Sequence, residues 1–107
     1  MNKKIKMRCQ VRATILKALA HPTRIFIIEE LARGERCVCE LREMIGADIS
    51  TVSKHLSILR NAGFVSVDKR GLKVFYRLAI PCALNFLKCA ENVMKTRAKR
   101  QLELSKS

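Results

Sequence analysis

The chain has 107 residues, of which 22 are Lys or Arg and 9 are Asp or Glu, so its formal net charge is +13. This length predicts a single domain, and a hydrophobic content of 49% is too high for a disordered basic tail. No apolar run approaches the ~18–20 residues of a membrane span, and we expect no signal peptide. A large enzyme, a membrane protein and a secreted protein are therefore disfavoured.

The excess of positive charge indicates a polyanionic partner. Residues 1–17 contain six Lys or Arg and no acid, and residues 60–77 contain five Lys or Arg against one acid. These basic segments do not form one amphipathic helix with a bulky apolar face, so an anionic membrane is disfavoured as the partner. Nucleic acid is favoured, and generic solubility charge is the alternative.

Three helices are predicted in the first half of the chain. Apolar residues at helical spacing predict the first over residues 8–20. Pro22 suits the first position of a second helix, which ends at Gly34. A third helix is predicted to start near Val38 and to end at Gly46.

A fourth helix follows a short link, and its two faces differ in chemistry. Asp48 is placed to cap it by accepting from the backbone amides of Ser50 or Thr51. One face is a narrow apolar stripe of Ile49, Val52, Leu56 and Leu59. The opposite face is polar and free of acids, with Ser50, Lys54, Ser57 and Asn61, flanked by Thr51 and Ser53. The third and fourth helices therefore predict a helix-turn-helix.

The period changes to two after Gly63, which predicts a hairpin whose turn is the basic stretch Lys69-Arg70-Gly71-Leu72. Pro81 then opens a last helix. The order α-α-α-α-β-β-α predicts a mainly α fold with a β-hairpin wing, a winged helix-turn-helix. We expect residues 1–107 to form one such domain, with N- and C-terminal dimerisation helices and basic tails at 1–7 and 98–107. A homodimer is expected because so short a chain cannot bury both terminal apolar stripes by itself.

The chain resembles the ArsR/SmtB family of metal-sensing transcriptional repressors. The stretches that carry the resemblance are Leu16 to Arg24, Glu35-Arg36-Cys37-Val38-Cys39-Glu40-Leu41, Ser50 to Gly63, and the hairpin Arg70 to Leu78. The resemblance implies a dimeric repressor, not an enzyme, that leaves its double-stranded operator DNA when a metal or metalloid binds.

The resemblance also places the DNA-reading residues. The family's recognition helix falls on Ser50 to Asn61, with its start meeting base edges in the major groove and the wing binding phosphate. The implied DNA-binding residues are Ser50, Thr51, Ser53, Lys54 and Ser57 on the helix, and Lys69, Arg70 and Lys73 on the wing. A solvated charged face is the alternative for Lys54 and the wing.

Cys37-Val38-Cys39 is similar to the pair that supplies thiolate ligands in the arsenical- and cadmium-sensing branches of the family. Soft thiolates favour arsenite, antimonite, cadmium, lead or zinc, so As(III), Sb(III) or a soft divalent ion is the expected inducer, with no permanent cofactor. The third cysteine of the arsenical pattern is replaced by Arg42, and Cys9 from across the dimer is a candidate third ligand. Two structural cysteines are the alternative.

The geometry of a regular helix predicts how such an inducer acts. Residues two apart point ~200° away from each other, so Cys37 and Cys39 cannot reach one ion while their segment is helical. We therefore expect binding to pull the start of the third helix into a non-helical turn.

The other cysteines and the histidines have weaker patterns. Cys82 and Cys89 lie ~10.5 Å apart along the last helix, and packing at the dimer interface is expected. Five cysteines without an export signal predict a reducing compartment, so a cytoplasmic location is expected. The rival function is a thiol redox or persulfide-sensing repressor on the same scaffold, in which Cys82, Cys89 or Cys9 forms disulfides or persulfides. A thiol oxidoreductase is disfavoured because no Cys-x-x-Cys motif is present. His21 and His55 are expected to be structural.

Overall fold

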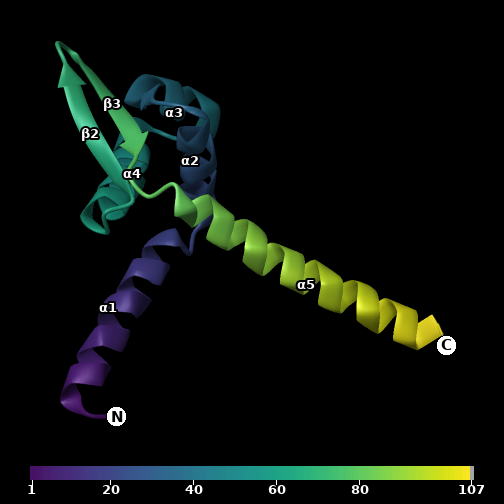
Figure 1. Ribbon diagram of the computed structural model, residues 1–107. Coiled ribbons are helices and arrows are strands. Elements are labelled where there is room, and N and C mark those ends of the chain that lie inside the picture. Colours follow the sequence, from purple (N-terminus) through teal and green to yellow (C-terminus); the bar gives the residue numbers. More distant parts are fainter. Residues whose placement is uncertain (107) are drawn as a thin grey trace.

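The computed structural model describes residues 1–106 and confirms the winged helix-turn-helix (Figure 1). Ser107, the end of the expected basic tail at 98–107, lies outside the described residues. In chain order the elements are α1 (Lys3–Leu19), α2 (Pro22–Arg33), β1 (Arg36–Cys37), α3 (Val38–Ile45), α4 (Ile49–Asn61), β2 (Val65–Arg70), β3 (Lys73–Leu78) and α5 (Cys82–Lys106).

The first two helices are set by side-chain caps. The predicted start of the first helix at residue 8 is wrong, because α1 begins at Lys3, where the Asn2 side chain accepts a hydrogen bond from the Ile5 amide at 2.9 Å. The apolar pattern is weak over this first stretch, so periodicity alone missed it. His21 caps α2 by accepting from the Thr23 amide through Nδ1, with Pro22 at the first helical position.

The helix-turn-helix has the boundaries that the sequence predicts. α3 starts at Val38, and Gly46 ends it with a left-handed φ of 76°, a conformation that glycine adopts without strain. Asp48 caps α4 through a 2.8 Å hydrogen bond that its Oδ1 accepts from the Thr51 amide, as predicted. The turn between the two helices is therefore fixed at both of its ends.

The sheet has one strand more than the predicted hairpin. Its order is β1-β3-β2, all antiparallel, with Cys37 opposite Phe75 and Asp68 also opposite Phe75 on the other side. The turn is shorter than the four residues predicted. Lys69 and Arg70 belong to β2, and only residues 71–72 connect the strands. The two-residue β1 was missed because so short a strand has no alternation to detect.

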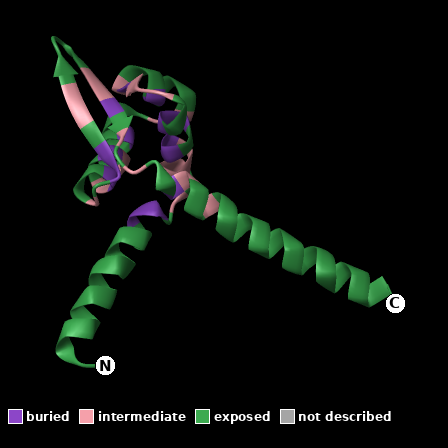
Figure 2. Ribbon diagram, viewed as in Figure 1, coloured by how far each residue is buried: buried purple, intermediate pink, exposed green. Residues whose placement is uncertain are grey.

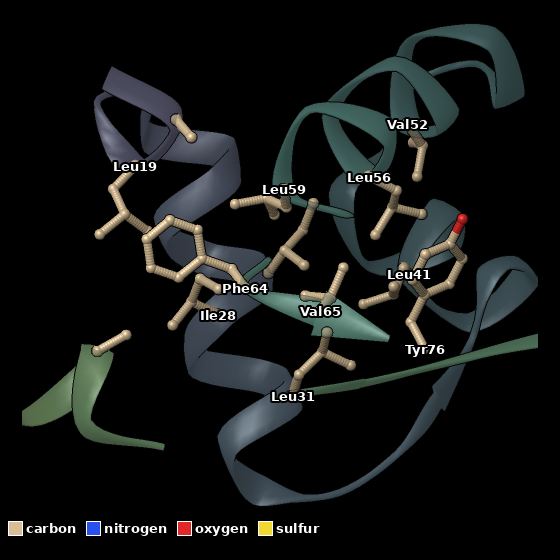
Figure 3. Packing of buried hydrophobic residues seen from close by; sticks show 13 residues of the cluster. Leu19, Ile28, Leu31, Leu41, Val52, Leu56, Leu59, Phe64, Val65 and Tyr76 are labelled. Carbon is tan, nitrogen blue, oxygen red and sulfur yellow. The ribbon is translucent and has the colours of Figure 1, made fainter. Parts of the chain in front are cut away.

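The core lies among α2, α3, α4 and the base of the wing (Figure 3). Its fully buried side chains are Ile27, Ile28, Leu41, Val52, Leu56 and Leu59. The terminal helices contribute little to this core: α1 buries only Ala18 and Leu19, and α5 only Ala83. Both project from the globular part and are exposed along most of their length (Figure 2). They leave the helix-turn-helix and the wing uncovered.

Candidate DNA-binding surface and cysteine site

The residues expected to read DNA lie on the open face of α4. Ser50, Thr51, Ser53, Lys54 and Ser57 are all exposed. The hydrogen bond from the Thr51 amide, followed by those from the Thr51 and Ser50 side chains, lowers the pKa of Asp48, so the cap stays ionised at neutral pH. The helix thus presents small hydroxyls and one Lys at its start, a surface that can approach base edges closely.

A cleft of about 750 Å³ separates α4 from the wing, with the start of α3 at one end. Ser53, Lys69 and Lys73 line it, which brings three of the expected DNA-binding residues together. Arg42 and Arg60 line the same cleft, although neither is among the DNA-binding residues expected from the sequence. Their positive charge was visible in the sequence, but only the fold shows that they share this cleft.

Arg70 is placed differently from its neighbour Lys69. Its guanidinium forms a bidentate pair with Glu35 at 2.7 and 2.8 Å, and its Nε donates to Asp68 at 2.9 Å. It also lies 4.6 Å from the centroid of the Phe75 ring. These hydrogen bonds, the one to Glu35 first, raise the pKa of Arg70, which therefore remains fully charged but already engaged by two carboxylates.

Cys37 and Cys39 form a disulfide, with their Cα atoms 5.4 Å apart. Cys37 precedes α3 as its N-cap in an extended conformation, and its sulfur also accepts from the Cys39 amide at 3.2 Å. The expectation that α3 must unwind before both sulfurs can share an ion is therefore wrong. One cysteine is outside the helix, so the two sulfurs approach each other without any loss of helical structure.

One carboxylate fixes the backbone at this cysteine pair, and a second compensates a neighbouring charge. Glu40 Oε1 accepts from the Cys37 amide at 3.1 Å, which completes a capping box at the start of α3. Arg36 lies between Glu30 and Glu40, with nitrogen-to-oxygen distances of 3.8 and 4.0 Å. Because two acids compensate its charge, Arg36 supplies less positive potential to the adjacent cysteines than an unpaired Arg would.

The pair opens into the cleft, because both Cys37 and Cys39 line it. Cys37 is buried and Cys39 is exposed. Cys9, Cys82 and Cys89 are exposed free thiols among the described residues. Within one protomer, Cys9 lies on α1, which projects away from α3 (Figure 1). Residues 1–106 contain no group of three or more Cys, His, Asp or Glu side chains arranged to hold a metal ion.

The two histidines lie outside this cleft. They are at the point where the start of α2 lies beside α4. The ring centroids of His21 and His55 are 4.4 Å apart. His21 is an N-cap, and His55 Nδ1 is buried without a hydrogen-bond partner among the described residues. No helix in the described part of the chain is long and apolar enough to cross a membrane.

The fold and the helix-turn-helix define a class of DNA-binding regulators, and comparison with known proteins identifies the family. The profile of the family described as bacterial regulatory protein, arsR family, matches residues 21–67. The biofilm growth-associated repressor of Xylella fastidiosa is 31% identical over 96 residues, which cover 90% of this chain and 84% of that protein. The chain therefore belongs to the ArsR family of bacterial regulatory proteins.

Two further relatives support the assignment. The HTH-type transcriptional repressor SmtB of Mycobacterium tuberculosis is 45% identical over 65 residues, which cover 61% of this chain and 48% of that repressor. The chain thus spans about half the length of this relative. A homodimeric winged helix-turn-helix DNA-binding domain from Mycobacterium bovis, described as a possible ArsR-family regulator, has a TM-score of 0.77 at 25% identity, covering 94% of this chain and 93% of that one. SmtB and the biofilm growth-associated repressor are repressors, and the Mycobacterium bovis chain is a DNA-binding domain. None of them is an enzyme, which confirms the expectation that this chain is not an enzyme.

Proposed function

We propose that this protein is a homodimeric, cytoplasmic transcriptional repressor that releases its operator DNA when a thiophilic ion binds Cys37 and Cys39. The observation that carries the proposal is that both cysteines open into the cleft lined by Ser53, Lys69 and Lys73. Inducer and DNA therefore act on the same small group of elements: α3, α4 and the wing.

In the proposed complex, α4 enters the major groove. Ser50, Thr51, Ser53, Lys54 and Ser57 face the bases, with Lys54 able to donate to guanine or to phosphate. Lys69 and Lys73 bind the phosphate backbone, and Arg42 and Arg60 in the same cleft extend this positive surface. Arg70 contributes less than its charge suggests, because two carboxylates already engage it.

The inducer belongs to the class of ions that thiolates prefer: As(III), Sb(III), Cd²⁺, Pb²⁺ or Zn²⁺. The disulfide supports a shared site, since it shows that the two sulfurs can approach each other. A third thiolate must come from outside this pair, and Cys9 of the second protomer is the candidate. Reduced, deprotonated thiols are needed, so inducer binding is expected under reducing conditions and to weaken as pH falls.

The strand β1 provides the mechanical link from the ion to the DNA. Cys37 belongs to β1 and is opposite Phe75 in β3 of the wing. Drawing the two sulfurs around an ion shifts β1, and β1 is hydrogen-bonded to the wing. Because binding is reciprocal, the ion weakens DNA binding by the factor by which DNA weakens ion binding.

A DNA-release titration tests the proposal. Duplexes selected from a random pool by the metal-free, reduced protein are labelled, and fluorescence anisotropy follows their release by arsenite, antimonite, Cd²⁺, Pb²⁺ or Zn²⁺. Cys37→Ser and Cys39→Ser are expected to keep the metal-free affinity for DNA but to lose release. Cys82→Ser and Cys89→Ser, on α5, are the matched controls and should release DNA normally.

Two results would contradict the proposal. One is normal release by the Cys37→Ser/Cys39→Ser double variant, which would place the inducer elsewhere. The other is loss of DNA binding by these variants before any ion is added, which would make the cysteines part of the DNA-binding structure.

The disulfide favours one second candidate, a thiol redox repressor on the same scaffold. In that case hydrogen peroxide oxidises the two thiols to the disulfide. The two protons and two electrons that the thiols release reduce the peroxide to two molecules of water. The pair involved is Cys37 and Cys39 rather than Cys9, Cys82 or Cys89, which are free thiols in the structure. Peroxide-induced DNA release that dithiothreitol reverses, with no release by any of the ions under reducing conditions, would select this alternative.

A further inference from the structure

We propose that Glu35 is a positioning residue that couples the cysteine strand β1 to the wing, through its ion pair with Arg70. The proposal rests on the proposed function, because the signal it transmits is the binding of an ion at Cys37 and Cys39. It assigns the coupling to one carboxylate that neither binds the ion nor touches DNA.

Glu35 lies in the short connection between α2 and β1, two residues before Cys37. Both of its carboxylate oxygens accept from Arg70, at 2.7 and 2.8 Å, and Arg77 Nε lies 3.8 Å from Oε2. Arg70 and Arg77 are on β2 and β3, so one side chain joins the approach to β1 to both strands of the wing.

The register of the sheet shows why the Glu35–Arg70 ion pair, called the bridge below, transmits movement of β1 to the wing. β1 contributes only two paired residues, Arg36 opposite Tyr76 and Cys37 opposite Phe75. So short a ladder is a weak mechanical link by itself. The bidentate pair adds a second attachment with a defined orientation, because a guanidinium and a carboxylate bonded through two parallel hydrogen bonds cannot rotate freely.

Arg70 is in turn held at the wing by two further contacts. Asp68 accepts from its Nε at 2.9 Å, and its guanidinium carbon lies 4.6 Å from the centroid of the Phe75 ring. Phe75 is the residue opposite both Cys37 and Asp68. The side chains of Glu35, Arg70 and Phe75 therefore connect the backbone at the cysteine pair to the end of β2, from which the wing turn projects.

The expected contribution of this bridge is to coupling rather than to stability. Arg70 is 49% exposed and Glu35 26% exposed, and exposed ion pairs contribute little to folding free energy. Loss of the bridge should therefore leave the fold and the two binding sites in place. What changes is how far a shift of β1 moves the wing.

Glu35→Gln is the test variant, and Asp68→Asn is the matched control. Each removes one carboxylate from Arg70, but only Glu35 attaches Arg70 to the β1 segment, because Asp68 is on the same strand as Arg70. The full-length reduced proteins are titrated with Cd²⁺ alone, with sulfur-to-cadmium absorption reporting ion binding. DNA affinity is measured without Cd²⁺ and at saturating Cd²⁺.

The ratio of these two DNA affinities is the coupling factor. Couplings of this kind are typically ~5–150-fold, and for Glu35→Gln we expect the factor to fall to within about threefold of 1. The Cd²⁺ affinity of Glu35→Gln should match that of the wild type. Asp68→Asn should retain the wild-type factor.

The outcomes separate this inference from the proposed function. If Cd²⁺ weakens DNA binding by the same factor in the wild type and in Glu35→Gln, the coupling role of Glu35 is overturned and the proposed function stands. An equal loss of response in Asp68→Asn also overturns the coupling role, because the cause would then be the general state of the wing. A wild type that binds Cd²⁺ but keeps its DNA overturns induction by Cd²⁺, and the coupling role of Glu35 with it.

Discussion

At the scale of single residues, His55 is the group whose surroundings most clearly predict a response to pH. It is half-buried on α4, its ring centroid is 4.4 Å from that of His21, and its Nδ1 has no partner among the described residues. Burial, followed by the charges of His21, Arg24 and Lys54, lowers the pKa of His55 below its ordinary value of 6.5. The folded protein therefore favours the neutral ring.

This shift predicts a loss of stability in mild acid. Below pH 6.5, and until the lower folded pKa is reached, the unfolded chain binds a proton at His55 that the folded protein does not. The free energy of unfolding should therefore fall as pH decreases from 7.5 to 5.5, and His55→Gln should flatten this dependence. Urea denaturation at several pH values measures it, and an identical slope in wild type and variant would contradict the assignment.

At the scale of elements, the sequence was sufficient wherever local chemistry decides the structure. The cap at Asp48, the stop at Gly46 and three of the four apolar positions of α4 (Val52, Leu56 and Leu59) are confirmed, because they depend on local chemistry. Ile49, the fourth position of the predicted stripe, is exposed. The site was less predictable because it depends on partners distant in sequence. Glu35 meets Arg70 across 35 residues, and β1 exists only by pairing with β3.

The cysteine pair was also predictable only in part. Its spacing and its place at the start of α3 were readable from the sequence. The helical geometry assumed for both cysteines was wrong, because α3 starts at Val38, as predicted, so Cys37 is its N-cap and only Cys39 is helical. A shift of one residue across a helix boundary changes whether two sulfurs diverge or meet.

The capping box of α3 leads to a prediction at this scale. Glu40→Ala removes the acceptor of the Cys37 amide and should lower the free energy of unfolding by about 1 kcal/mol. It should also weaken Cd²⁺ binding, because the Cys37 backbone is less firmly held. Glu40→Gln keeps an oxygen acceptor and should retain most of both properties.

Glu43→Ala is the control for this prediction, since Glu43 is exposed on the same helix and lies outside its capping box. Denaturation and cadmium titration of the three variants measure the two effects. If Glu40→Ala and Glu43→Ala lose the same amount of stability and Cd²⁺ affinity, the capping box does not position the thiol pair.

At the scale of the whole molecule, the charge is distributed unevenly. Residues 21–79, which hold the helix-turn-helix and the wing, have ten Lys or Arg against seven acids. Residues 1–20 have six Lys or Arg and no acid, and residues 80–107 have six against two. Most of the net charge therefore lies on the terminal helices, where it raises the general attraction to DNA rather than its sequence preference.

The shape of the chain supports the proposed homodimer, in which a second copy would cover these helices. Its radius of gyration is 17.5 Å, against about 13 Å for a compact chain of this length. Large apolar side chains stay exposed on both projecting helices, among them Val11 and Ile15 on α1 and Phe86 and Val93 on α5. An exposed apolar surface of this kind is typical of a protein interface.

A charge placed on this surface should separate the protomers and, with them, the two recognition helices. Phe86→Glu introduces a carboxylate at a side chain that is 55% exposed in the single protomer, and burying it in a dimer without a partner is costly. The variant should be monomeric at micromolar concentration in sedimentation velocity, and its operator affinity should fall by about 100-fold or more, because one half-site of a palindrome no longer supports the other. Asn92→Glu adds the same charge at an exposed polar position of α5 and should remain dimeric. A dimeric Phe86→Glu, or a monomeric wild type with full operator affinity, would show that the apolar surface of α5 has another role.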